Sequence, residues 1–203
     1  LYRDMLGERM VYTCAFWKGS RDLNTAQEKK LKLVCDKLGI KEGMHVLDIG
    51  CGWGSFAEYA TQVRKAKVTG VTISHEQGLI ARERCAGFPV DIRVQDYRDL
   101  ENDEKFDRIV SLGMFEHVGR KNYEYYMRYI RQHLNTDGKL NLDLKDEITG
   151  AITVVHDGKV LWDPESLNKV EKKPVTPVKL ETVSEKISEL PIIEKKKWSL
   201  LKM

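Results

Sequence analysis

The sequence has little of what metal sites, membrane spans and nucleic-acid interfaces require. Its four cysteines form no Cys-x-x-Cys pair and no Cys/His cluster, which argues against zinc and favours a reducing compartment. No apolar run is long enough to span a bilayer, and no signal peptide is visible. The net charge of +3 is too balanced for nucleic acid but permits contact with an anionic membrane surface. We expect a cytoplasmic protein without a metal, either soluble or peripheral to the membrane.

Proline is also scarce over most of the chain. Four of the five prolines follow Leu144, and the 203 residues suit one domain with an appendage. We therefore expect one domain over residues 1–144 and a separate tail over 145–203. Within the tail, residues 152–162 have the pattern of a β-hairpin with an Asp-Gly turn. The Lys/Glu/Pro/Val-rich stretch 169–187 is typical of extended or disordered chain.

A glycine-rich turn is the strongest single feature of the sequence. The run Val46–Gly54 passes from apolar residues through Asp48 to three glycines at every second position, and a helical pattern follows over 55–63. Glycine permits the positive φ of a tight turn and lets a ligand lie against bare backbone, and the helix N-terminus offers unpaired N–H groups. The spacing differs from the dinucleotide fingerprint and from the phosphate loop, whose lysine is absent. We interpret the turn as a site for an adenosyl ligand with an amino-acid tail, which points to S-adenosyl-L-methionine. The alternative is a plain strand-to-helix turn.

Apolar runs and helical patterns alternate along the expected domain, which predicts an α/β fold with a parallel sheet covered on both faces. The first long helix starts at a capping box of Thr25 and Glu28, and Gly39 ends it. A turn is expected over 135–138. The expected strands are 44–49, 67–72, 90–94, 106–112 and 139–144, and the further helices are 55–63, 76–85 and 121–134. The apolar face of the first long helix consists of Leu31, Val34, Cys35 and Leu38.

The carboxyl ends of these strands form the edge where open α/β sheets bind ligands. The second strand ends in Thr72, Ile73 and Ser74, with hydroxyl groups where many nucleotide folds place a ribose-binding acid. Glu76 and Gln77 follow. They reach a ribose in one interpretation and form the solvated first turn of a helix in the other.

Two further strand ends and the N-terminal segment carry candidate site residues. Asp96 has a good position to accept the adenine amine and Tyr97 to flank the ring, with loop capping an equally good alternative for both. Glu116 is a carboxylate at the ligand edge and a candidate for chemistry. His117 is either a general base or a structural residue. The aromatic segment 10–17 is either a strand or lid packed on the domain or a cover over a ligand.

Residues 1 to roughly 142 resemble the catalytic domain of the cyclopropane-fatty-acyl-phospholipid synthases, which are related to the mycolic acid cyclopropane synthases. The resemblance implies a Rossmann-like class I methyltransferase sheet, here truncated and followed by an irregular C-terminal tail. A helix over 1–5 without an initiator Met adds the expectation that the chain begins inside a larger protein. The stretches that carry the resemblance are 10–17, 46–54, 70–74, 95–100, 106–111 and 113–119.

The family transfers the methyl group of S-adenosyl-L-methionine to a cis double bond of an unsaturated acyl chain in a membrane phospholipid. The intermediate is a carbocation, from which a bound hydrogencarbonate removes a proton before the cyclopropane ring closes. The resemblance therefore implies a transferase of lipid biosynthesis that acts on unsaturated phospholipid at the membrane surface, with no nucleic-acid partner. A homodimer is one assembly state to test.

The resemblance also assigns roles to individual residues. Tyr12 and Thr13 contact the methionine end of the cofactor, and Thr13 stands where the family usually has Ser. Cys14 and Glu116 match two positions of the hydrogencarbonate site, which makes them the implied catalytic residues. Fixed negative charge and aromatic surroundings suit a cationic intermediate, as Glu116 and Tyr12 would provide. The other implied cofactor contacts are Asp48, Gly50, Cys51, Gly52, Thr72, Ile73, Ser74, Gln77, Asp96 and Tyr97.

The sequence departs from the family in two places. Asp143 takes the position of a family histidine, and residues 145–203 do not resemble the long region that supplies a further tyrosine and much of the acyl-chain channel. Three functions stay open: a lipid C-methyltransferase, a small-molecule methyltransferase on the same fold, and a cofactor-binding, catalytically impaired remnant with an interaction tail.

Overall fold

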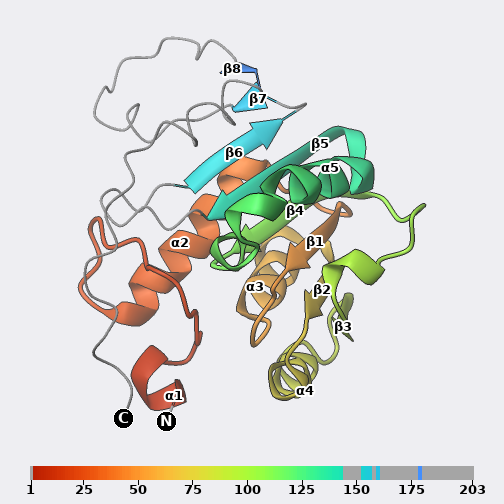
Figure 1. The fold of residues 1–203 in the computed structure, drawn as a ribbon. Coiled ribbons are helices and arrows are strands. Elements are labelled where there is room, and N and C mark those ends of the chain that lie inside the picture. Colours follow the sequence, from red (N-terminus) through yellow and green to blue (C-terminus); the bar gives the residue numbers. More distant parts are fainter. Residues whose placement is uncertain (1, 144–151, 157–158, 161–177, 180–203) are drawn as a thin grey trace, which may run out of the picture.

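The computed structural model describes residues 2–143, 152–156, 159–160 and 178–179 (Figure 1). The predicted turn at 157–158 and most of the stretch 169–187 lie outside the described residues. Within the described part, no helix is both long and apolar enough to cross a bilayer.

The described strands form one sheet in the order β3-β2-β1-β4-β5-β6-β7-β8 (Figure 1). The pairs from β3 to β5 are parallel, and those from β5 to β8 are antiparallel. The order reverses beside β1, so the neighbouring connections leave that strand in opposite directions and open a crevice at its carboxyl end. The strands are β1 His45–Ile49, β2 Lys67–Thr72, β3 Val90–Val94, β4 Phe106–Leu112, β5 Leu134–Asp143, β6 Ile152–His156, β7 Lys159–Val160 and β8 Val178–Lys179.

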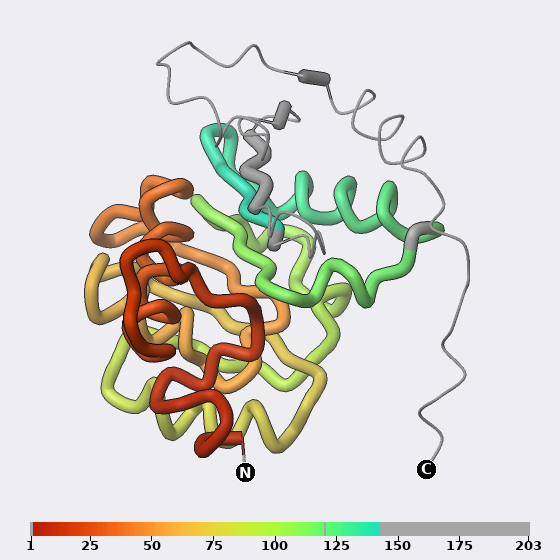
Figure 2. The backbone as a smooth tube through the Cα atoms, turned by 90° about the vertical axis from the view of Figure 1, so that its left-hand side faces the viewer, coloured from red at the N-terminus to blue at the C-terminus, as the bar shows by residue number. Residues whose placement is uncertain are grey.

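Helices cover both faces of the parallel part of the sheet (Figures 1 and 2). On one face, α2 and α3 pack against Val46, Val68 and Val110; on the other, α5 packs against Leu47 and Ile109. Successive strand residues point to opposite faces, and burial on both explains the nearly continuous apolar runs of β1 and β4. The helices are α1 Tyr2–Leu6, α2 Leu23–Leu38, α3 Ser55–Arg64, α4 His75–Arg84 and α5 Tyr123–His133, with short 3₁₀ turns η1 Tyr97–Asp99, η2 Phe115–His117 and η3 Arg120–Asn122.

The predicted α/β fold is confirmed, and the predicted bounds of β2, β3 and β4 agree with the structure. The start of α2 was predicted wrongly. Asp22, not Thr25, is the N-cap, because its carboxylate accepts hydrogen bonds from the backbone N–H and hydroxyl of Thr25 at 2.9 and 2.7 Å. Glu28 does not reach back to the cap; it accepts from Arg9 at 2.5 Å. Gly39 ends the helix in the left-handed region, as predicted.

The predicted turn over 135–138 lies inside β5 as an irregularity of its pairing with β4. Phe106 pairs with Leu134, whereas Arg108 pairs with Lys139, so β5 carries extra residues between these two points. The predicted hairpin is confirmed in its strands, since β6 and β7 pair antiparallel through Val155 and Val160.

The N-terminal segment between α1 and α2 contains no strand, although its sequence allowed one. It lies along the side of the domain away from α5 (Figure 2). Met10 and Val11 are buried, whereas Tyr12 is 68% exposed. Arg9 anchors the segment to the domain by an ion pair with Glu58 of α3 at 3.2 Å. Arg84 of α4 donates to the same Glu58 oxygen at 3.1 Å.

Candidate cofactor site

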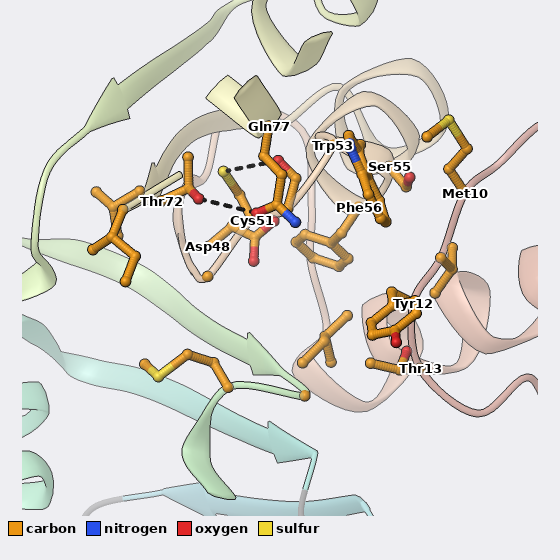
Figure 3. A pocket seen from close by; sticks show the side chains of 18 of the residues that line it. Met10, Tyr12, Thr13, Asp48, Cys51, Trp53, Ser55, Phe56, Thr72 and Gln77 are labelled. Carbon is orange, nitrogen blue, oxygen red and sulfur yellow. Dashed lines mark hydrogen bonds between the residues drawn. The ribbon is translucent and has the colours of Figure 1, made fainter. Parts of the chain in front are cut away.

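A cavity of about 450 Å³ opens at the carboxyl ends of β1, β2 and β4. Its size falls in the range of small-molecule sites, and its place is the crevice that the strand order creates. The N-terminal segment forms the opposite wall: Tyr12 and Thr13 face Asp48 and Thr72 across it (Figure 3). The predicted site residues that line the cavity are Tyr12, Thr13, Asp48, Gly50, Cys51, Gly52, Thr72, Ile73 and Gln77.

The glycine turn after β1 forms the floor of the cavity. Gly50, Gly52 and Gly54 have φ angles of 78°, 55° and 79°, a region that side-chain-bearing residues rarely adopt. Gly54 is the N-cap of α3 and offers no side chain to the first-turn N–H groups. These groups and the positive end of the helix dipole therefore remain as a site for an acceptor atom.

Asp48 places a buried carboxyl on the cavity wall. The residue is 2% exposed, and burial raises the pKa of its carboxyl to about 7. No described residue donates a hydrogen bond to it. A buried carboxyl of this kind is stabilised in its charged form only by a cation or donor. The sulfonium and ammonium groups of S-adenosyl-L-methionine are such cations, so the residues present fit this cofactor.

The end of β2 divides its polar residues between the cavity and the next helix. Thr72 donates to Oε1 of Gln77 at 3.3 Å, and both residues line the cavity. Ile73 lines it as well and is 82% exposed. Ser74 lies outside the lining, where it caps α4 by accepting from the N–H of Gln77 at 3.3 Å.

At the end of β3, Asp96 and Tyr97 both make contacts within the domain. Asp96 caps η1 and pairs with Arg98 at 2.6 Å, and the hydrogen bonds from the Arg98 side chain lower the pKa of Asp96. Tyr97 packs edge-on against Tyr126, with ring centroids 5.2 Å apart. Neither Asp96 nor Tyr97 lines the cavity. Their neighbour Gln95 does, although sequence reasoning passed over it.

The two implied catalytic residues stand outside the cavity lining. Cys14 is an exposed free thiol one residue beyond Thr13. Glu116 is exposed on η2, and its Oε1 lies 4.0 Å from the position of a Cβ built on Gly113. Gly113 itself lines the cavity, together with His117, so the turn after β4 brings both Glu116 and His117 to its rim.

Sequence reasoning missed two aromatic residues of the wall. Trp53 and Phe56 line the cavity, and Trp53 packs against Tyr12 and Tyr2 with centroid distances of 6.1 and 5.1 Å. A signal was available, because Trp53 stands inside the glycine turn between Gly52 and Gly54. The other lining residues that were not predicted as site residues are Met10, Val11, Leu31, Ser55, Val71, Leu112, Met114 and Val118.

The sheet order, the glycine turn after β1 and the cavity at its carboxyl end define a Rossmann-like domain of the class I methyltransferase type. Within that class, the chain belongs to the mycolic acid cyclopropane synthetase family, whose model matches residues 1–162.

Two solved structures and one curated protein illustrate the likeness. The chain is 52% identical over 138 residues to the cyclopropane-fatty-acyl-phospholipid synthase of Escherichia coli K12, a match that covers 68% of this chain and 36% of that protein. A mycolic acid cyclopropane synthase complexed with SAH and CTAB superposes with a TM-score of 0.64 at 32% identity, covering 68% of this chain and 49% of that one. Coclaurine N-methyltransferase bound to N-methylheliamine and SAH superposes with a TM-score of 0.65 at 32% identity, covering 70% of this chain and 43% of that one. The chain thus spans about a third of the synthase, as the 36% shows.

Proposed function

We propose that this chain forms the S-adenosyl-L-methionine-binding part of a lipid C-methyltransferase that converts cis double bonds of unsaturated phospholipid acyl chains into cyclopropane rings. The observation that carries the cofactor assignment is the buried Asp48 carboxyl, which faces the cavity beside a glycine turn and accepts no hydrogen bond within the described structure. The lipid reaction is supported by the 52% identity to the bacterial synthase. The roles fall on residues 1–144 and leave the tail, 145–203, without one.

Different residues of the cavity are proposed to bind different parts of the cofactor. Asp48 holds the cationic end of the cofactor, while Thr72 and Gln77 supply polar atoms for the ribose. Gly50 and Gly52 keep the floor free of side chains. When bound, S-adenosyl-L-methionine supplies an activated methyl group, and its transfer needs chiefly alignment with the acceptor.

The rim after β4 is proposed to receive the acyl chain and a hydrogencarbonate ion. Leu112, Met114 and Val118 add apolar surface to this side of the cavity, which suits a hydrocarbon chain. Glu116 and Cys14 are proposed to hold the hydrogencarbonate, which would supply a base for the proton lost as the ring closes. The negative charge of Glu116 also suits a nearby carbocation.

Contact with a membrane surface follows from the need to reach a phospholipid chain. Tyr2 of α1 and Trp17 of the N-terminal segment are 48% and 54% exposed, and Lys18 is exposed beside Trp17. Aromatic rings with basic neighbours suit the interface of an anionic bilayer.

Homodimer formation is also part of the proposal. Sedimentation velocity measures the assembly state, and a single monomeric species would refute the homodimer.

A second candidate is a cofactor-binding domain with impaired catalysis. It is favoured by the lining of the cavity, which includes the proposed cofactor contacts Asp48, Thr72 and Gln77 but neither of the implied catalytic residues, Cys14 and Glu116. A small-molecule methyltransferase is a third, because the fold fits coclaurine N-methyltransferase with a TM-score of 0.65.

One experiment separates the lipid enzyme from the impaired domain. The chain is incubated with labelled S-adenosyl-L-methionine and vesicles of unsaturated phospholipid, and the lipids are examined by mass spectrometry for cyclopropane rings. Ring formation supports the lipid enzyme, and saturable cofactor binding without product supports the impaired domain. Absence of both binding and product refutes the proposal altogether.

A further inference from the structure

Lys30 of α2 is a buried cation beside the proposed cofactor site. The residue is 2% exposed, and its ammonium group donates to Oγ1 of Thr13 at 2.5 Å. The next residue on the helix, Leu31, lines the cavity. Moving an unpaired ammonium group out of water costs on the order of several kcal/mol of free energy. A lysine at this place therefore needs a polar environment. Thr13 is one part of that environment, and Thr13 lines the cavity.

Thr13 is held from two sides. Its hydroxyl oxygen accepts from Lys30, and its methyl group lies 2.5 Å from where a Cβ on Gly113 would stand, a gap that exists because residue 113 is glycine. When both the hydroxyl and the methyl group of a threonine are fixed in this way, the side chain is restricted to one rotamer. Since the oxygen is an acceptor toward Lys30, its own proton is available to donate, and no described residue receives it.

We propose that Lys30 is a positioning residue that acts through Thr13. By donating to Oγ1, it turns the Thr13 hydroxyl into a directed and strengthened donor toward an oxyanion in the cavity. The ligand chemistry is a carboxylate-type anion, which is either the carboxylate of the amino-acid tail or hydrogencarbonate. This inference rests on the proposed function and adds a residue to it.

The opposite wall of the cavity favours the carboxylate of the amino-acid tail as the anion that Thr13 binds. Asp48 and Thr13 face the cavity from different sides (Figure 3). An amino-acid tail carries an ammonium and a carboxylate group, and such a pair matches a carboxylate on one wall and a polarised donor backed by a cation on the other. A neutral nucleoside makes no use of that arrangement.

The test compares two ligands on five proteins: the wild type, Lys30→Met, Thr13→Val, Thr13→Ser and the double variant Lys30→Met with Thr13→Val. S-adenosylhomocysteine carries the amino-acid tail, and 5′-deoxy-5′-methylthioadenosine has the same nucleoside without it. We expect Lys30→Met and Thr13→Val each to weaken S-adenosylhomocysteine binding about tenfold or more in calorimetry, because a hydrogen bond to a charged group is lost. Binding of the tail-free nucleoside should stay within about twofold, and Thr13→Ser should retain both affinities. The double variant should bind no worse than either single one, because the two residues act as a unit.

A hydrogencarbonate titration of the S-adenosylhomocysteine-loaded proteins separates the two sources of the anion. If hydrogencarbonate is the partner, the loss of about tenfold appears there and not in the nucleoside titrations, which supports the inference with that ligand. Folded variants that keep wild-type affinity for both anions overturn it. Equal losses for both nucleosides also overturn it, because they indicate a structural role.

Failure of the inference is distinguishable from failure of the proposed function. A wild type that binds neither nucleoside refutes both, whereas a wild type that binds and variants that match it refute only the role of Lys30. Thermal melting of each protein identifies any variant that fails to fold. Thr13→Val keeps the test decisive if Lys30→Met unfolds, because Thr13 is half-buried on the surface segment.

Discussion

Gly50 lies so close to Met114 that a Cβ on Gly50 would stand 2.8 Å from the Cβ of Met114. The first residue of the glycine turn is thus pressed against the turn after β4, and the two loops jointly form the floor and rim of the cavity. The contact explains glycine at position 50 by space as well as by its φ of 78°.

Replacing Gly50 by Ala is therefore expected to damage binding and stability together. The left-handed backbone costs about 1 kcal/mol or more for a residue with a side chain, and the collision with Met114 adds to it. Gly43→Ala is a matched control, because Gly43 has a φ of 79° but nothing within 4 Å of its Cβ position. Calorimetric titration with S-adenosylhomocysteine should show loss of affinity in Gly50→Ala alone. Equal behaviour of the two variants in titration and melting would contradict the steric argument.

Asp48 predicts a pH dependence of stability. Burial raises the pKa of its carboxyl from 3.8 to about 7, so the folded chain holds a proton that the unfolded chain has already released. Stability from this group is greatest below about pH 4 and is lost as the pH rises toward about 7. Asp48→Asn should therefore be more stable than the wild type at pH 8, by on the order of 4 kcal/mol, in urea unfolding. The exposed Asp103→Asn serves as control and should show no such gain.

The same carboxyl predicts proton release on cofactor binding. A cationic ligand stabilises the charged form of Asp48 and lowers its pKa, so binding at pH 6 should release up to about one proton. Calorimetry in two buffers of different ionisation enthalpy measures this number directly. An enthalpy independent of the buffer in the wild type would show that no cation reaches Asp48.

Glu58 predicts how firmly the N-terminal segment is held. One of its oxygens accepts from both Arg9 and Arg84, and the three side chains are 17%, 21% and 12% exposed. Glu58→Gln leaves two half-buried guanidinium groups without their shared carboxylate, at a cost of about 1–2 kcal/mol. Glu124→Gln removes an exposed ion pair with Arg128 and should change stability by less than about 0.5 kcal/mol. Similar losses in both variants would mean that the Glu58 contacts contribute no more than a surface pair.

Glu116 predicts a separation of chemistry from binding. Because it lies at the rim and outside the cavity lining, Glu116→Gln should abolish ring formation and leave S-adenosylhomocysteine affinity within about twofold. Lipid mass spectrometry and calorimetry on the same preparation give the two measurements. A large loss of affinity would show that Glu116 belongs to the cofactor site instead.

Local sequence patterns were sufficient to predict the bounds of an element where its signal was strong. The runs of β2 and β4 are rich in apolar and β-branched residues, and their bounds followed from the sequence. The start of α2 was predicted from Thr25 and Glu28 alone. In the structure Asp22 is the N-cap, and Glu28 accepts a hydrogen bond from Arg9, which is distant in the chain. The capping-box pattern contains no information on that partner.

The sequence by itself determined the parallel α/β sheet, the glycine turn and the acid at the end of β1, because each depends on residues close together in the chain. The tertiary structure alone decided which strand-end residues reach the cavity, that Trp53 joins Tyr12 in its wall, and that Lys30 is buried against Thr13. A lysine on a helix is ordinarily solvated, whereas this one is 2% exposed and contacts Thr13 of the N-terminal segment. Contacts of that kind join residues distant in the chain, and no local pattern encodes them.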